Sequence, residues 1–361
     1  MSEADLSQEP IYSARPTIRV NGQADEKVSS LMTTLTMTEQ DGGMSALDLR
    51  LSNFASDPEG DADYAFEDEQ VLKLGATIEV YAGDADGPRA IFKGVITGLE
   101  IDYPDAAPPE IVVLAEDNLQ RARMSRRTAL HADATIAGLA NDLASMLSLT
   151  PVVTGFTDNI GTQLQLDESD LAFLRRLLAL HDGDLQVVGS ELHVSHRKDV
   201  QRGTLTLELY SQLRHARFSV DLAHQVTEVT LAGWNPGQGQ RVTGTSNGTN
   251  LGPGSGRLGA TILQDAVGER SEHVGHLAVA TDDEARAVAD AAFDRRARRF
   301  VTVCGTAEGN PSLRVGTHLT LHGLSRRLNN TYYVAKACHR FDLSHGYETD
   351  FEAECAYLGN P

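Results

Sequence analysis

The chain of 361 residues is poor in cysteine, tryptophan and other aromatic residues. It contains three cysteines (Cys304, Cys338 and Cys355), one tryptophan and 6% aromatic residues. An odd number of cysteines without CxxC spacing favours free thiols in a reducing compartment, so folding has to depend on packing. The low aromatic content also argues against a carbohydrate-binding β protein, which would need exposed aromatic platforms.

Basic charge is scarce as well. The chain has 31 Lys and Arg against 51 Asp and Glu, a net charge of −20 and a pI near 4.9. Such a chain is a poor binder of nucleic acid or of an anionic membrane surface. No apolar run approaches the roughly 20 residues of a membrane span. The acidic first five residues lack the hydrophobic core of a secretory signal. We therefore expect a protein of a reducing cytoplasm, with no membrane or specific nucleic-acid partner.

Acidic residues concentrate near the N-terminus, where residues 1–69 hold 15 acids and four bases. This surface is either a solvated acidic face or a negative wall that faces a partner or a passage. Under the second interpretation, acids that line a passage would repel anionic cargo. The candidates are Glu39, Asp41, Asp57, Glu59 and Asp61.

Residues 1–125 have the pattern of a β domain. Segments 31–37 and 47–51 alternate apolar and polar residues, and Asn21-Gly22 is a hairpin turn signal after the segment 17–20. Further apolar segments at 78–81, 90–96 and 111–114 continue this pattern, separated by turns rich in Asp, Gly and Pro.

Residues 126–200 predict a small α+β domain. Apolar residues at helical spacing indicate helices over 133–149 and from about 167, with Gly183 as the expected stop of the second helix. A hairpin is expected over 185–194. Strands then resume at 204–209 and 226–231, and β structure returns from 301 to the C-terminus.

Residues 236–299 form the predicted insertion into a second β domain, which comprises 201–235 and 300–361. Nine glycines between 233 and 259 predict a flexible surface loop, or one that becomes ordered when a partner docks. A helix is expected over 282–299, with acids in its first turn and arginines in its last. Trp234 is expected to anchor a core edge.

Two distant segments match at a constant separation of 241 positions. LKLGATIEV at 72–80 aligns with LRVGTHLTL at 313–321, and an apolar β segment follows each copy. The match is either an ordinary strand–turn–strand pattern or a duplication. Under the second interpretation, the chain is mainly β, with two related antiparallel, tube-like β-barrels plus a small α+β middle domain and a helix-containing insertion.

Motifs for catalysis and for metal binding are weak. Ser246 lies in a G-x-S-x-G match that has no apolar strand directly before it and no helix directly after it. His318, His322, Cys338, His339 and His345 lack zinc-site spacing, and Asp84-Ala-Asp86-Gly87 lacks the later carboxylate of a calcium loop. No Walker loop, GxGxxG after a strand or HExxH is present. We expect no catalytic, cofactor-binding or metal-binding residues; a cell-wall hydrolase that uses Ser246 or the histidines is the alternative.

Three segments, in this order, resemble the phage late control D family. They are QLDESDLAFLRRL at 165–177, VTLAGWNP at 229–236, and a longer match over 307–354. The signature positions that this resemblance assigns are structural: Ser169, Asp170, Phe173, Leu177, Gly233, Trp234, Gly316, Tyr333, Phe341 and Tyr347.

Members of that family are baseplate hub proteins of contractile tails, and they are similar to the N-terminal part of type VI secretion spike proteins, the valine-glycine repeat protein G family. The resemblance implies a homotrimer with two barrel domains per subunit, which joins a hexameric inner tube to a trimeric spike. Other baseplate proteins would be partners, and cargo or a tape-measure protein would make transient contact. Because the chain ends at Pro361 without a needle, the spike is expected to be a separate polypeptide. The match at 307–354 favours an extracellular injection particle over a phage tail.

Overall fold

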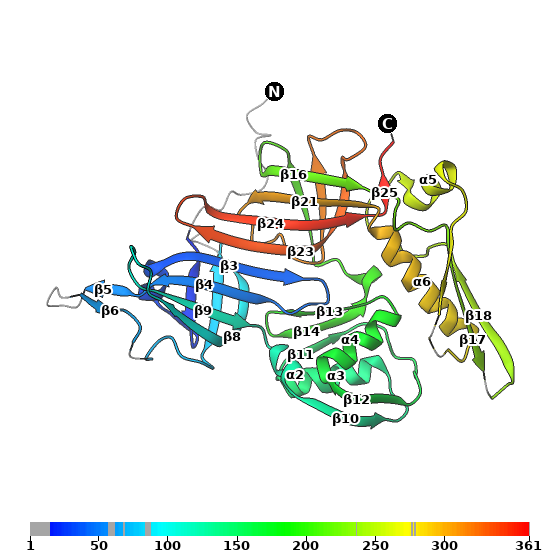
Figure 1. Ribbon diagram of the computed structural model, residues 1–361, viewed down its shortest axis with the longest axis horizontal. Helices are drawn as coiled ribbons and strands as arrows, with labels where there is room; N and C mark the ends of the chain where they lie inside the picture. The colour runs from blue at the N-terminus through cyan, green and yellow to red at the C-terminus, as the bar shows by residue number, and fades with distance from the viewer. Residues whose placement is uncertain are drawn as a thin grey trace.

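The computed structural model describes residues 15–56, 62–67, 69–83, 88–235, 237–275, 277 and 279–360. Its main feature is a 13-stranded sheet in the order β16-β21-β24-β23-β3-β4-β9-β8-β7-β1-β2, with β15 paired to β22 and β22 to β23. Strands from the two ends of the chain therefore lie side by side, as Figure 1 shows for β23 and β3.

The N-terminal half of the sheet is built as the alternation of the sequence predicts. Asn21 and Gly22 both have positive φ, which confirms the two-residue hairpin turn. Leu47, Leu49 and Leu51 are buried, whereas the residues between them face the other side. The elements of this half are β1 (Thr17–Val20), β2 (Gln23–Ala24), α1 (Glu26–Leu31), β3 (Met32–Gln40), β4 (Ala46–Ser52), β7 (Thr77–Ala82), β8 (Arg89–Asp102) and β9 (Glu110–Glu116), with the separate hairpin β5 (Phe54–Ser56) and β6 (Ala62–Tyr64).

The C-terminal half contributes the remaining strands of the sheet. They are β15 (Gly203–Glu208), β16 (Leu213–Val220), β21 (Val301–Glu308), β22 (Thr317–His322), β23 (Asn330–Asp342) and β24 (Gly346–Cys355). Each half has its own hydrophobic core, and the core of the N-terminal half also takes in Phe341 and Tyr347 from the C-terminal half. Among the described residues, strand pairs close neither half into a barrel, so the chain is mainly β with two core-bearing halves of one sheet.

The middle unit packs below this sheet in Figure 1 and has a third core. Its second helix begins where Ser169 Oγ accepts a hydrogen bond from the N–H of Ala172, as a cap should. The prediction for Gly183 was wrong: the helix ends at Leu180, and Gly183 opens a strand where an added Cβ would lie 2.4 Å from Leu178. The elements are α2 (Gln120–Met124), β10 (Arg126–His131), α3 (Ile136–Leu147), β11 (Thr150–Val153), β12 (Gln163–Ser169), α4 (Asp170–Leu180), β13 (Gly183–Val188), β14 (Glu191–His196) and η2 (Arg197–Asp199).

The insertion has a fourth core, and much of its predicted glycine-rich loop is ordered. Strands β17 and β18 pair continuously from Val229↔Ser246 to Asn235↔Gln240. Gly244 lies against α6, where a Cβ would be 2.3 Å from the carbonyl carbon of Ala285. The glycine therefore allows close packing rather than flexibility. The elements are β17 (Glu228–Asn235), β18 (Gln240–Ser246), β19 (Arg257–Leu258), α5 (Gly259–Ala266), β20 (Ser271–Val274) and α6 (Asp282–Arg298), with β25 (Tyr357–Leu358) paired to β19.

Helix α6 confirms the predicted helix at 282–299. Thr281 caps it by accepting a hydrogen bond from the N–H of Glu284 at 3.1 Å. Trp234 corrects another expectation, because 60% of its surface is exposed and it anchors no core edge. Among the described residues, no helix combines the length and the apolar character needed to cross a membrane.

Candidate assembly site: open strand edges and an ionic junction

The two halves of the sheet repeat one another strand by strand. Neighbouring strands run β1-β7-β8-β9-β4-β3 in the first half and β15-β22-β23-β24-β21-β16 in the second. The matched sequence segments form the same turn in both copies: Gly75 and Gly316 have positive φ and donate their N–H to Ile96 and Val334 at 2.9 and 3.0 Å. The structure thus confirms the repeat. One difference is that β1 is antiparallel to β7, whereas β15 is parallel to β22.

The halves meet where β3 pairs with the C-terminal part of β23, from Lys336↔Gln40 to Asp342↔Thr34. A buried ion pair lies beside this junction. The carboxylate of Glu39 accepts hydrogen bonds from Arg314 Nε at 2.8 Å and from the N–H of Val315 at 2.6 Å. Burial raises the pKa of Glu39, but the charge and hydrogen bonds of Arg314 outweigh it, so that the pKa lies below its usual value.

His339 lies on the same junction and is fully buried. Its Nδ1 is 2.7 Å from the Tyr347 hydroxyl oxygen, and the two rings stack. Burial, helped by the Arg314 charge, lowers the pKa of His339 to about 3. His339 is therefore neutral near pH 7, and its role is structural.

Within the described residues, the sheet has two open edges that are equivalent to the two edges joined between β3 and β23. Strand β16 pairs with β21 on one side, and no strand of the described residues covers its other edge. The C-terminal part of β8 pairs with β9, while β7 covers only the part of β8 from Arg89 to Val95. These open edges present unpaired backbone donors and acceptors, which can add a strand from another chain.

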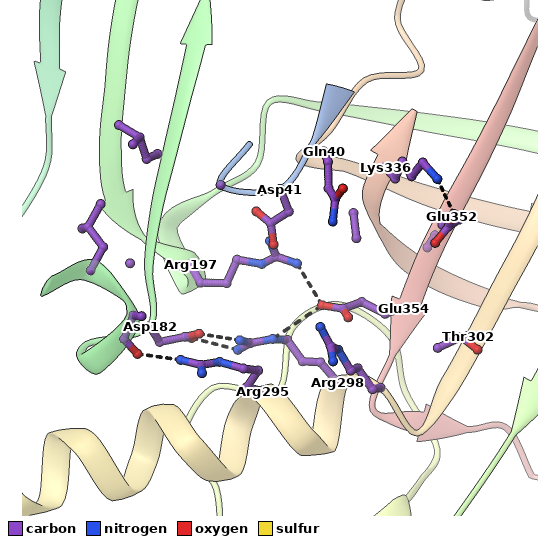
Figure 2. A pocket seen from close by; sticks show the side chains of 18 of the residues that line it. Gln40, Asp41, Asp182, Arg197, Arg295, Arg298, Thr302, Lys336, Glu352 and Glu354 are labelled. Atoms are coloured by element: carbon purple, nitrogen blue, oxygen red, sulfur yellow. Dashed lines mark hydrogen bonds and ion pairs between the residues drawn. The ribbon is translucent and has the colours of Figure 1, made fainter. Parts of the chain in front are cut away.

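Beside the sheet, an ionic junction connects all four units (Figure 2). Arg197 of η2 pairs with Asp41, which follows β3, and with Glu354 of β24 at 2.9 Å. Arg298 of α6 pairs with Asp182, which follows α4, and its Nε lies 3.7 Å from the same Glu354. The cavity between these groups is about 480 Å³, and Arg175, Arg295, Arg299 and Lys336 also line it.

Burial and neighbouring charges keep Arg197 charged and Tyr333 neutral in the ionic junction. The Arg197 guanidinium lies 3.2 Å from the centroid of the Tyr333 ring. Burial disfavours its charge, but Tyr333, Asp41 and Glu354 raise the pKa of Arg197 overall. Burial raises the pKa of Tyr333, so that its hydroxyl stays neutral. Asp41, Asp182 and Glu354 are each ion-paired with an arginine, so the ionic junction holds the units together.

The signature residues of the resemblance occupy structural positions. Asp170 pairs with Arg127 at 2.8 Å, and Phe173 stacks on His131 with centroids 4.9 Å apart. Leu177 is in the core of the middle unit, and Gly233 packs on Val279. Phe341 and Tyr347 lie opposite each other where the two halves meet, Gly316 and Tyr333 lie toward the other end of β23, and Ser169 and Trp234 lie in other units.

Of the five acids predicted to line a passage, the structure describes Glu39 and Asp41. Glu39 is only 1% exposed and ion-paired, so its assignment to a passage wall was wrong. Asp41 belongs to the ionic junction. Asp57, Glu59 and Asp61 lie outside the described residues, as do Asp84, Asp86 and Gly87 of the calcium-like loop.

The catalytic alternatives gain no supporting geometry. Ser246 is buried at the end of β18, where it accepts a hydrogen bond from the N–H of Gly248 at 3.2 Å, and no helix follows directly. His318 and His322 lie on β22, and His345 is held in a turn by Asp342. No group of three or more His, Cys, Asp or Glu side chains suited to a metal is found in the described part of the chain.

The residues of the ionic junction were missed by the sequence analysis. Arg197, Arg298 and Glu354 stand far apart in the chain and carry no local motif. For Glu39 a signal was present: it continues the alternation of Leu35 and Met37, which places it on the buried face of its strand.

The family model described as the Alg8 N-terminal domain matches residues 16–342. The chain belongs to this family. The resemblance to the late control D family is more specific than this match and stays a prediction. No curated protein matches this chain.

Several solved structures share the fold of this chain. The 43 kDa tail protein of prophage MuSo2 from Shewanella oneidensis has a TM-score of 0.70 and 14% identity, with 94% of this chain and 97% of that chain covered. A tail protein from Neisseria meningitidis has a TM-score of 0.65 and 11% identity, covering 95% and 99%. An E. coli component of the type VI secretion system, itself similar to bacteriophage T4 tail proteins gp27 and gp5, has a TM-score of 0.59 and 13% identity, covering 95% and 79%. The chain therefore has a tail-protein fold.

Proposed function

We propose that this protein is the structural hub of the baseplate of a contractile injection particle. It acts as a homotrimer that joins the hexameric inner tube to a trimeric spike and surrounds the passage for cargo. The protein has no enzymatic role in this proposal. The particle assembles in the bacterial cytoplasm and is then released.

The observation that carries the proposal is the structural repeat. Each chain holds two copies of one strand order, connected side by side through β3 and β23. A three-fold ring of such chains presents six similar units, so that one face can meet six tube subunits while the chains themselves meet three spike subunits. The tail-protein fold supports this assignment.

The units take different parts in this assembly. The two tube-like domains, residues 1–125 and 201–235 with 300–361, form the ring, except that residues 228–235 pair with β18 and β20 and therefore go with the insertion. The middle domain, 126–200, and the insertion, 236–299, project outward toward other baseplate proteins. The ionic junction of Arg197, Arg298 and Glu354 fixes their orientation to the ring.

An acidic passage wall is still proposed, with Glu39 removed from it. Asp57, Glu59 and Asp61 are the remaining candidates, because Asp41 is ion-paired with Arg197, and they would keep anionic cargo from adhering. Replacing Asp57, Glu59 and Asp61 by Asn or Gln should slow ejection without harming assembly. Unchanged ejection would end this part of the proposal.

A hub of a contractile phage tail is the second candidate, because two of the similar structures are tail proteins. Neighbouring genes distinguish the two: an AAA+ ATPase gene beside sheath, tube and spike genes favours the injection particle.

The decisive experiment is to image particles that contain this protein and to count its copies at the junction of tube and spike. Three copies, each contributing two sheet halves to a ring, are expected. A single copy, six copies or a position outside this junction would overturn the proposal.

A further inference from the structure

We propose that neighbouring protomers join by strand pairing, with β16 of one protomer antiparallel to residues 98–103 of the next, in the same register that joins β3 to β23 within one chain. This inference rests on the proposed trimer and assigns its interface. The structure carries it through three observations: equivalent strands, open edges and complementary side chains.

Strands β8 and β23 are equivalent residue by residue. Pairing with β9 matches Val95 to Glu116 and Asp102 to Glu110, whereas pairing with β24 matches Tyr333 to Glu354 and Arg340 to Glu348. Both strands have their register shift at the same place, after Ile96 in one and after Val334 in the other. Asp102 therefore occupies the position of Arg340, and Tyr103 follows at the position of Phe341.

Strands β3 and β16 are equivalent in the same way. The register shift lies between Met32 and Thr34 in one strand and between Leu213 and His215 in the other. β-Bulges are specific features of a strand pair, so their recurrence in both halves fixes the alignment. Thr36 therefore corresponds to Arg217, and Met37 corresponds to Phe218.

The contact between β3 and β23 within one chain, called the inner junction, joins one edge of β3 to one edge of β23. In the chain, β3 covers the C-terminal part of β23. The equivalent edge of β8 and the equivalent outer edge of β16 have no strand partner within the described residues. Neither residues 98–103 nor β16 contain proline, so both can donate along a full ladder.

The register of the inner junction brings complementary side chains together at the outer one. Where the inner junction has Arg340 opposite Thr36, the proposed contact has Asp102 of one chain opposite Arg217 of the next. These two residues have opposite charges, and neither forms an ion pair within the described part of one chain. His339↔Met37 becomes Ile101↔Phe218, and Ala337↔Glu39 becomes Leu99↔Val220. Opposite charges and apolar pairs directly across an antiparallel ladder stabilise it.

Exposure gives an independent reason to expect a covering strand. Ile101, Tyr103 and Val220 are 51%, 60% and 46% exposed. Their equivalents at the inner junction, His339, Phe341 and Glu39, are 0%, 6% and 1% exposed. The outer edges thus expose apolar side chains at the positions that the inner junction buries.

The occupant is a second copy of this chain rather than another protein, because each open edge fits the other end of the same sheet. Such head-to-tail contacts generate closed rings or open filaments, depending on the rotation between subunits. Closure after three chains is the assumption taken from the proposed function.

Disulfide crosslinking tests the register. Glu100 and Ser219 would lie directly opposite each other, about 5 Å apart between Cα atoms, a separation that a disulfide can bridge. The protein carries Glu100→Cys and Ser219→Cys in a Cys304→Ser background, because Cys304 is exposed and pairs with Arg217 in the sheet. It is purified with co-expressed tube and spike proteins and oxidised with copper phenanthroline.

The matched control carries Glu100→Cys with His215→Cys, which stands four residues along β16 and hence roughly 13 Å away. We expect most chains to crosslink in the protein with Glu100→Cys and Ser219→Cys, and few chains to crosslink in the control. Trimers by mass without preferential 100/219 crosslinking would overturn this register and leave the proposed function intact. Efficient 100/219 crosslinking into open filaments or dimers would support the register and overturn the trimeric hub.

A charge exchange tests the same contact without oxidation. Asp102→Arg or Arg217→Asp alone places like charges opposite each other and should weaken association by about tenfold. The double exchange should restore association, because the attraction is only reversed. Equal weakening by the single and double exchanges would show that the two residues do not meet, and would overturn the pairing.

Discussion

The inner junction and the open outer edges use the same strands in two different ways. At the inner junction, β23 is covered by β3, and His339 and Phe341 are buried. At the outer edge, the equivalent part of β8 leaves Ile101 and Tyr103 exposed. One copy of the repeat is completed within the chain, and in the proposed pairing a neighbouring chain completes the other.

The two places also differ in buried charge. The inner junction contains the ion pair of Glu39 and Arg314, whereas the equivalent positions outside hold Val220 and Lys73. A charge pair suits a contact that forms once, during folding, because both partners lose water together. An apolar position suits a contact between separate chains, because no charge has to lose its hydration when the chains meet.

The largest expected effect is at this ion pair. Glu39→Gln leaves the Arg314 guanidinium, whose side chain is 24% exposed, without its anion, so the free energy of unfolding should fall by about 3 kcal/mol. Denaturant titration of the purified chain measures it. Asp48→Asn on the exposed face of neighbouring β4 is the control and should change it by less than about 0.5 kcal/mol. Equal effects of both changes would show that the inner junction has no special dependence on its ion pair.

The next effect compares equivalent aromatic residues. Phe341→Ala removes a side chain from the core of the N-terminal half and should cost about 3 kcal/mol, whereas Tyr103→Ala should cost less than about 1 kcal/mol in the free protomer. Denaturation midpoints of both variants provide the comparison. A Tyr103→Ala cost equal to that of Phe341→Ala would mean that the outer edge is already covered within one chain.

The third effect depends on pH and on His339. Because the pKa of His339 is lowered to about 3, the unfolded chain takes up a proton below about pH 6.5 that the folded chain does not. Stability from this group is therefore present at pH 7 and lost as the pH falls, by about 2 kcal/mol between pH 7 and pH 5. Denaturant titration at both pH values should show this loss in the wild type and not in His339→Gln.

Raised carboxyl pKa values act in the opposite direction. Burial raises the pKa values of Asp117 and Asp184 to about 6, so these groups favour the folded state as the pH falls. Both groups remain in His339→Gln, and the difference between the two proteins isolates the histidine. Identical pH dependence in both proteins would contradict a neutral, buried His339.

Much of the repeated sheet could be predicted from the sequence because its signals are local. Alternation over 31–37 and 47–51, the Asn21-Gly22 turn and the paired segments at 72–80 and 313–321 each depend on neighbouring residues. The same is true of α6, whose acidic start and basic end match its observed bounds.

The ionic junction and the insertion could not be predicted in this way. Arg197 reaches Asp41 and Glu354 only after three units have packed, so no local pattern marks it. A high frequency of glycine, as over 233–259, occurs both in flexible loops and in strands that pack closely on a helix. Gly244 is of the second kind. Only the packing distinguishes these two uses of glycine.

The smallest expected effect is at Trp234, which lies outside the repeated sheet and serves as a reference for Tyr103. Trp234 on β17 is as exposed as Tyr103, but the proposed strand pairing does not cover it. Trp234→Ala should therefore change the free energy of unfolding by less than about 1 kcal/mol and should leave trimer formation unchanged. Tyr103→Ala, by contrast, should weaken trimer formation although it has an equally small effect on the free protomer. Mass measurements of both variants over a concentration series distinguish the two aromatic residues, and an equal loss of trimers in both would mean that exposure alone, rather than position on the open edge, explains the effect of Tyr103.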